Sequence, residues 1–350
     1  MTATFEAPVA PAPRRPWLRR RRTFARTAFL VTVSLAVSWL LTETTELGGI
    51  LGFYLGLSLA LPVLVLAESA RHGVNVAVDR VATAVFAAAF GAVLIPWASI
   101  FVTVYRKGSR AFHADYLTDD MRITASSDPL GSGGVAHAVT GTLLMVLIAS
   151  AIAVPLGVLA ATYIVEIKGR FAGLVRFLTQ AMSGVPSIVA GLFIYSTVVV
   201  TFGGFSAWAG ALAYVILMVP TVARTAEEVL KLVPDDLRAA SYALGASQAR
   251  TTFRVVLPTI ASGLLTSAIL GIARVVGETA PLILTAGYFV ATSAKLDEPI
   301  ASLPIYIFSS LGLGDDNATS RAWGGSLVLL LAVFVLFALA RIIGSRLSRK

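Results

Sequence analysis

Two opposite charges, Arg274 and Glu278, lie within an otherwise apolar stretch of the sequence. A charge at the centre of a bilayer costs on the order of 3 kcal/mol, so it persists where it has a partner or faces water. The four-residue spacing puts both side chains on one helical face, close enough to form an ion pair. A guanidinium is also a rigid fork of donors that fits the oxygens of an oxyanion. The pair therefore predicts either a structural link that satisfies itself or a contact for an anion crossing the membrane.

The residues beside this pair predict an interruption of the helix. Pro281 cannot donate a backbone N–H and frees a carbonyl one turn earlier, so a kink is expected next to the two charges. Thr279, between the acid and the proline, is assigned to the same substrate path. Further candidates for hinges or for helix packing are Gly277, Pro186 and Pro220. Breaks at prolines can serve as hinges, although most prolines in membrane helices are simply accommodated kinks.

A second candidate cation, Arg224, ends an apolar stretch. It could meet an anion that leaves the membrane, or it could extend its charge to the interface while its stem stays in lipid. Glu227 and Glu228, together with Asp235 and Asp236, are expected to form a solvated face and the N-terminal cap of a following helix, because carboxylates favour helix starts.

The composition identifies the environment in which these charges lie. Apolar residues make up 57% of the 350 residues and charged residues only 13%, and the mean hydropathy is +0.82. A soluble domain would carry nearer a quarter of charged residues. The sequence predicts an all-α, polytopic membrane bundle of about eight spans of roughly 20 residues. The expected spans lie near residues 24–42, 48–67, 81–105, 138–164, 172–202, 207–224, 260–290 and 324–345.

The distribution of Lys and Arg predicts the orientation of the chain. If the N-terminus is cytoplasmic, 21 of the 28 basic residues lie inside and Arg274 is in the membrane. The six in the expected outer loops are Arg106, Lys107, Arg110, Arg122, Lys295 and Arg321. This asymmetry predicts that both termini are cytoplasmic. Residues 1–23 form a basic cytoplasmic tail that sets topology or also touches anionic lipid. Residues 24–67 are an added pair of helices, and residues 80–350 form the main domain.

A polar segment at residues 235–258, within a loop at 225–258, separates two of the expected spans. Small residues let a short helix lie close to a partner, a glycine ends it, and a proline stands where the next helix starts. The segment resembles the cytoplasmic coupling loop of ABC-importer permeases. The positions that match this loop, and that the resemblance assigns to contact with an ATPase, are Ala239, Ala240, Ser241, Gly245, Ala246, Leu257 and Pro258. Ala239 replaces the glutamate usual in that family, which removes any salt bridge that this glutamate makes.

Residues 80–350 as a whole resemble the PstA-type permeases of phosphate importers. The motifs behind the resemblance occur in the family's order: TGTLL at 140–144, SGVPSIVAGLF at 183–193, VPTVARTAEE at 219–228, GIARVVGETAPLILTA at 271–286 and PIASLPIYIF at 299–308. The resemblance implies a type I ABC importer core in a bacterial plasma membrane. It also implies alternating access driven by partners: a second, PstC-like permease, PstB-like ATPase subunits that bind ATP and Mg, and an extracytoplasmic PstS-like phosphate-binding protein.

Features missing from the sequence narrow the alternatives. The chain has no Gly-Lys dipeptide and hence no Gly-rich phosphate loop, so it is expected to carry no cofactor and to depend on another chain for ATP hydrolysis. His72, His113 and His137 do not have the spacing of a metal site. The placement of the basic residues favours a membrane over nucleic acid. A permease for sulfate or molybdate, or a secondary transporter, remain alternatives, although the latter would typically contain inverted repeats and several buried acids.

Overall fold

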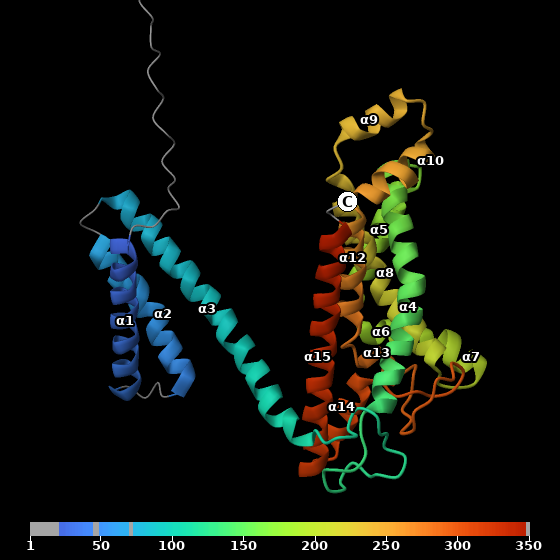
Figure 1. Cartoon of the computed structure of the whole chain (residues 1–350), viewed down its shortest axis with the longest axis horizontal. Helices are drawn as coiled ribbons and strands as arrows, with labels where there is room; N and C mark the ends of the chain where they lie inside the picture. Colours follow the sequence, from blue (N-terminus) through green and yellow to red (C-terminus); the bar gives the residue numbers. More distant parts are fainter. Residues whose placement is uncertain (1–20, 45–48, 70–72, 348–350) are drawn as a thin grey trace, which may run out of the picture. The chain divides into compact units, whose positions relative to one another are not determined.

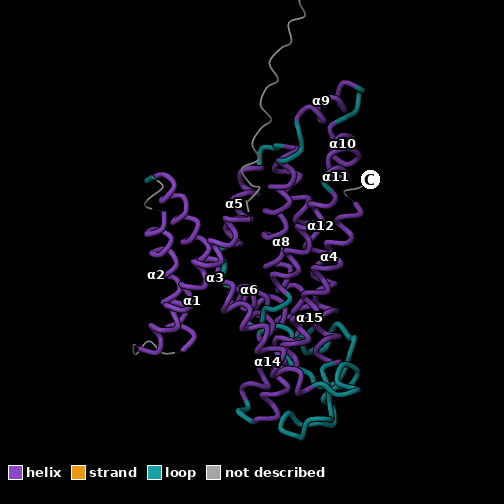
Figure 2. Tube along the Cα trace, turned by 60° about the vertical axis from the view of Figure 1, so that its left-hand side comes forward, coloured by secondary structure: helices purple, strands orange, loops and turns teal. Residues whose placement is uncertain are grey.

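The computed structural model describes residues 21–44, 49–69 and 73–347, which consist of helices and loops and contain no strand (Figure 2). The chain divides into two compact units, Met1–Phe101 and Val102–Lys350. The all-α fold class is therefore confirmed. Each unit has its own packing and is described separately below.

The first unit contains α1 (Arg21–Thr44), α2 (Gly49–Ser69) and most of α3 (Val74–Gly108). α1 and α2 pack closely at Gly56, where a Cβ would come within 3.0 Å of the Ser38 Oγ. Glycine permits such an approach between membrane helices because it leaves the backbone bare. Arg80 in α3 pairs with Glu68 in α2 at 3.1 Å. The role of residues 24–67 as an added helix pair stays a prediction.

The second unit is a helix bundle (Figure 1). Its helices are α4 (Ala136–Thr162), α5 (Ala172–Ser183), α6 (Ser187–Ile194), α7 (Val200–Phe202), α8 (Ala207–Lys231), α9 (Asp235–Ala243), α10 (Gln248–Thr251), α11 (Leu257–Thr259), α12 (Ala261–Val275), α13 (Ala280–Ile283), α14 (Leu303–Gly312) and α15 (Asp316–Leu347). Three π-helical segments, Tyr163–Ile167, Tyr195–Val199 and Thr252–Val256, follow α4, α6 and α10.

Five helices in the described part of the chain are long and apolar enough to cross a membrane, and two bent pairs raise the number to seven. The pair Ala172–Ser183 with Ser187–Phe202 bends by 104°, and the pair Gln248–Thr259 with Ala261–Val275 bends by 73°. The apolar part described for α1, Ala28–Thr44, is shorter. The predicted number of about eight spans is roughly consistent with this result.

The prediction of one continuous span at 260–290 is wrong. α12 ends at Val275, α13 is a single short turn, and most of residues 284–302 form a loop. Pro281 lies in the first turn of α13, where its missing N–H costs nothing. The expected kink is thus a complete break in the helix, because the chain starts a new turn at the proline instead of bending around it.

α8 packs against α4, α5, α6 and α12 and forms the centre of the second unit. Gly157 of α4 and Gly271 of α12 both lie against Val222 of α8. A Cβ added at either glycine would come within 2.8 Å or 2.6 Å of the Val222 side chain. Bare backbone at these two points therefore lets three helices meet. The buried residues around this contact include Ala153, Met218 and Val275, among others.

The two ends of the bundle carry different structures. α9 and α10 lie at one end, together with the C-terminal end of α15, whereas α14 and the loop before α4 lie at the other (Figure 1). At this second end the Thr292 N–H donates to Asp120 at 2.9 Å, which links two loops.

The prediction that Arg321 lies in an outer loop is wrong, because it lies in α15 and is 2% exposed. Its guanidinium donates to the carbonyls of Ser126, Asp128, Pro129 and Ser132.

Candidate functional site

The predicted coupling helix exists as α9, which projects from the end of the bundle (Figure 1). Gly245 ends it with φ +79°, a left-handed conformation that costs other residues energy. The Gly245 N–H bonds to the Tyr242 carbonyl at 2.9 Å, and the Ala246 N–H bonds to the Ser241 carbonyl at 3.2 Å. This double hydrogen bond is the Schellman motif. The expectation that Gly245 ends the helix is confirmed.

The residues of the matched triplet point in different directions. Ala239 and Ala240 are exposed, whereas Ser241 is buried and its hydroxyl bonds to that of Thr251 at 2.8 Å. Leu244, at the end of α9, is 90% exposed. α9 thus presents small and apolar residues outward while Ser241 holds it to α10. The expectation that Asp235 and Asp236 cap α9 is wrong, because Pro234 occupies the N-cap position and no side chain caps it. Both carboxylates lie in the first turn, where they complement the helix dipole.

The end of the matched segment lies beside a bend. Leu257 is half-buried and Pro258 is exposed in α11, two residues before the 73° bend into α12. Contact of any of the matched positions with an ATPase subunit stays a prediction.

Arg274 and Glu278 form the predicted ion pair. The expectation that both lie on one helical face is wrong, because α12 ends at Val275 and Glu278 follows in the turn after it. Arg274 lies in the last turn of α12, and its Nη1 donates to the Glu278 carboxylate. The Arg274 side chain is 51% exposed and that of Glu278 is 18% exposed. The hydroxyl of the fully buried Tyr214 donates to the Glu278 backbone carbonyl at 3.4 Å. The backbone of Glu278 is therefore held against α8, whereas the side chain of Arg274 is half exposed.

The proposed hinge and packing residues differ in their surroundings. Pro281 packs against α6, since a Cβ on Gly191 would come within 2.6 Å of the Pro281 Cα. Gly277 has no atom within 4 Å of a built Cβ, so close packing does not require a glycine there. Pro186 precedes α6 at the 104° bend, whereas α8 continues through Pro220 without a break. The position of a proline in the sequence did not distinguish these two outcomes.

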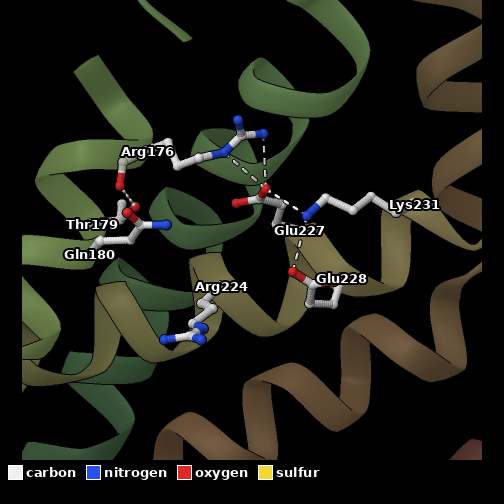
Figure 3. A pocket seen from close by; sticks show the side chains of 7 residues that line it. All are labelled: Arg176, Thr179, Gln180, Arg224, Glu227, Glu228 and Lys231. Carbon is white, nitrogen blue, oxygen red and sulfur yellow. Dashed lines mark hydrogen bonds and ion pairs between the residues drawn. The ribbon is translucent and has the colours of Figure 1, made fainter. Parts of the chain in front are cut away.

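A polar pocket of about 440 Å³ lies between α5 and α8 near the α9 end of the bundle (Figure 3). The prediction that Glu227 is solvated is wrong: it is 7% exposed. It accepts hydrogen bonds from Arg176 and Lys231, each at 2.9 Å. Lys231 also pairs with Glu228 at 3.0 Å. Thr179 and Gln180 line the same pocket.

Arg224 lines this pocket but does not join its ion pairs. Its side chain points away from the Glu227 cluster, and among the described residues no carboxylate pairs with it (Figure 3). Arg224 is exposed, so its guanidinium is able to bind an anion. Thr279, by contrast, lies at the start of α13 beside Glu278, away from this pocket.

Comparison with known proteins places this arrangement in a family. Residues 153–349 match the family described as "Binding-protein-dependent transport system inner membrane component". The chain belongs to this family. It is accordingly a multi-pass component of the inner membrane, in agreement with its apolar helices.

Individual relatives of the permease have more specific names. The chain is 40% identical to phosphate transport system permease protein PstA 1 of Mycobacterium tuberculosis over 77% of this chain and 90% of that protein. It is 43% identical to phosphate transport system permease protein PstA of Yersinia pestis over 60% of this chain and 72% of that protein. It is also similar to a solved chain of the MetNI methionine ABC transporter, with a TM-score of 0.47 and 22% identity over 62% of this chain and 93% of that chain.

Besides the pairs of Glu227, sequence reasoning missed the contact between Arg238 and Glu166. Arg238 of α9 donates to both carboxylate oxygens of Glu166, the shortest distance being 2.6 Å from Nη2 to Oε1. The two residues are 72 positions apart, so no local periodicity connects them. A usable signal was present, because Glu166 is a carboxylate at the end of an apolar stretch on the side where cations were expected to predominate.

Proposed function

We propose that this permease is a subunit of an ATP-driven phosphate importer and forms part of the path by which phosphate crosses the membrane. The similarity to the two PstA proteins, which covers most of each relative, supports this proposal over sulfate or molybdate. One observation supports an anion as the transported substrate: Arg274 belongs to a candidate span, yet its side chain is half exposed. A cation in such a position needs a polar or wet surrounding, which a path for anions provides.

The Arg274 pair supplies both binding and release. A guanidinium has five N–H donors, and the contact with Glu278 uses only one edge of it, so other donors are available to phosphate oxygens. Glu278 competes for the same guanidinium and thereby weakens its hold on the anion. Tyr214 fixes the backbone of Glu278, which keeps the acid in place while phosphate passes. Thr279 offers a hydroxyl next to the acid.

Arg224 provides a second contact for the anion, closer to the cytoplasm. It lies seven residues before Lys231, the last residue of α8, and faces the pocket beside α5. Phosphate leaving Arg274 would meet this unpaired guanidinium and then the solvent. Arg176 and Lys231 are already paired with Glu227 and therefore do not strengthen the binding of phosphate in this pocket. Release of phosphate to the cytoplasm thus stays favourable.

Movement would come from partners, in keeping with the family to which the chain belongs. ATP and Mg would bind to separate ATPase subunits, whose closure would move α9, with both termini of this chain in the cytoplasm. A second permease would share the path, and an extracytoplasmic binding protein would deliver phosphate to the opposite end of the bundle. Residues 80–350 would form the permease domain, with residues 24–67 as an accessory pair. The cycle is alternating access between two arrangements of the helices.

Uptake by the reconstituted transporter tests the proposal. The complete complex would be purified from its native membrane and placed in liposomes with labelled phosphate outside and ATP at the ATPase subunits. We expect ATP-dependent uptake that unlabelled phosphate suppresses and that sulfate or molybdate suppresses far less. Equal suppression by sulfate would instead indicate a permease for another oxyanion, and uptake without ATP would indicate a secondary transporter. Arg224→Gln is expected to slow uptake without loss of any bound subunit.

A further inference from the structure

The contact between Arg238 and Glu166 joins three elements of the permease. Glu166 lies in the π-helical segment that continues α4, and its side chain is 3% exposed. Arg238, in α9, is 15% exposed. Its Nη2 also donates to the Leu230 carbonyl at 3.2 Å, and its Nη1 donates to the Val233 carbonyl at 2.6 Å. One guanidinium thus holds the ends of α4 and α8 and the start of α9 together.

These contacts use the fork of donors that only arginine supplies. The carbonyl of Leu230, near the end of α8, accepts from the Val233 N–H at 3.3 Å and also from the Arg238 Nη2 at 3.2 Å. At the same time Arg238 engages both oxygens of Glu166. A charge-assisted pair of this geometry is stronger than a neutral hydrogen bond, and burial protects it from screening by salt. A lysine could reach only some of these acceptors.

Two further hydrogen bonds tie the rest of the coupling segment to the same point. Gln248 of α10 donates to the Glu166 backbone carbonyl at 2.7 Å. α10 is in turn bonded to α9 through the hydroxyls of Ser241 and Thr251. Both helices of the segment therefore meet at Glu166, by its side chain and by its backbone. α4 in turn packs along α8, which carries Arg224.

We propose that Arg238 and Glu166 are positioning residues that make α9 and the end of α4 one rigid body, so that displacement of the coupling segment moves α4 and α8 with it. The proposal rests on the proposed function, since it assumes that a partner displaces α9. It assigns no contact with phosphate to either residue.

Spin labels on the complete transporter test the rigid body directly. The chain contains no cysteine, so cysteines introduced at Leu159 of α4 and Asp236 of α9, both exposed, are the only ones it carries. The distance between the two labels would be measured in the nucleotide-free complex and in the complex trapped with ATP. We expect one narrow distribution that is the same in both states. A shift between the two states would overturn the proposal.

A pair of matched variants tests the contact itself. Glu166→Gln and Asp235→Asn each remove one carboxylate from Arg238, but the Glu166 side chain is 3% exposed and that of Asp235 is fully exposed. We expect Glu166→Gln to broaden the distance distribution and to lower the phosphate transported per ATP hydrolysed by at least about fivefold, the lower end of ordinary coupling between sites. Asp235→Asn should change neither, because an exposed ion pair contributes little.

The remaining outcomes also decide the proposal. Retention of full coupling by Glu166→Gln, or an equal loss in Asp235→Asn, would overturn it. If the Glu166→Gln variant does not assemble, Arg238→Lys is tested in its place. Lysine keeps the charge opposite Glu166 but cannot reach both the Leu230 and Val233 carbonyls, so a smaller loss of coupling is expected. Wild-type coupling in Arg238→Lys would refute the role of the arginine fork. Failure of the proposed function can be distinguished from failure of the rigid body. If the transporter does not import phosphate, the wild type shows no phosphate uptake, and the distances between the labels still test the rigid body.

Discussion

The left-handed glycine at the end of α9 allows a prediction whose size follows from the backbone alone. Gly245 has φ +79°, and a Cβ built there has no atom within 4 Å. Replacement by alanine therefore adds no clash with neighbours and changes only the conformational preference of this residue. A left-handed conformation costs an ordinary residue about 1–2 kcal/mol. We expect Gly245→Ala to lower the population of the correctly ended α9 by about 5- to 30-fold relative to the frayed form.

Amide hydrogen exchange over residues 235–246 measures this change in the assembled transporter. The hydrogen bonds of the Gly245 and Ala246 N–H groups should lose protection first, because they form the motif that needs the left-handed residue. Two controls separate this cause from others. Gly173→Ala, in α5, also meets open space but has ordinary φ and should leave exchange unchanged. Gly245→Asn should lose much less than alanine, because asparagine tolerates this conformation.

Exchange at the wild-type rate in Gly245→Ala, or equal loss of protection in Gly245→Asn and Gly245→Ala, would contradict this prediction. The first result would mean that α9 does not depend on this turn. The second would mean that the missing Cβ matters for contact with another chain and not for the backbone conformation.

Two other predictions concern packing and pH. Gly271→Ala places a Cβ within 2.6 Å of the buried Val222 side chain and should lower the free energy of unfolding by about 1–3 kcal/mol. In nanodiscs, the Tm of Gly271→Ala should therefore be lower than that of Gly173→Ala, and equal Tm values would contradict the close packing. Although burial raises the pKa of Asp120, hydrogen bonds from the Thr292 and Arg122 N–H groups and the Arg122 charge lower it below 3.8 overall. The ionised Asp120 carboxylate thus stabilises the contact between the two loops above pH 3.8, and this stabilisation is lost as the pH falls through the lowered pKa. Proteolysis of residues 112–135 should accelerate at that low pH, and the Asp120→Asn variant should show the same acceleration at neutral pH. A rate of proteolysis that does not depend on pH would refute the contact between Asp120 and Thr292.

The features that could be predicted from the sequence are those set by local spacing. The Arg274–Glu278 pair forms at the predicted spacing, although α12 ends at Val275 and Glu278 lies beyond it. The end of α9 follows from the need for glycine in a left-handed turn. Composition was enough for the fold class, because long apolar segments can satisfy their backbone in a membrane only as helices or closed barrels.

The features that could not be predicted depend on contacts between distant segments. Arg321 looked like an outer-loop cation, yet it is buried by carbonyls of a loop nearly 200 positions earlier in the chain. Glu166 and Arg238 meet only once α4 and α9 are folded. Pro186 and Pro220 read alike in the sequence, but only the first stands at a break, since tertiary packing decides whether a helix bends at a proline.

The central claim is that Arg274 contacts the transported anion, and ATP-driven phosphate uptake by an Arg274→Gln transporter tests it most directly. Loss of a charge-assisted contact of about 1.5–3 kcal/mol predicts a fall in uptake of about tenfold or more. The amounts of second permease and ATPase subunit that co-purify should stay at wild-type levels, because half of the Arg274 side chain is exposed and its ion pair is with Glu278, only four residues later in the chain. Wild-type uptake by this variant would contradict the account and leave the ion pair with a structural role only.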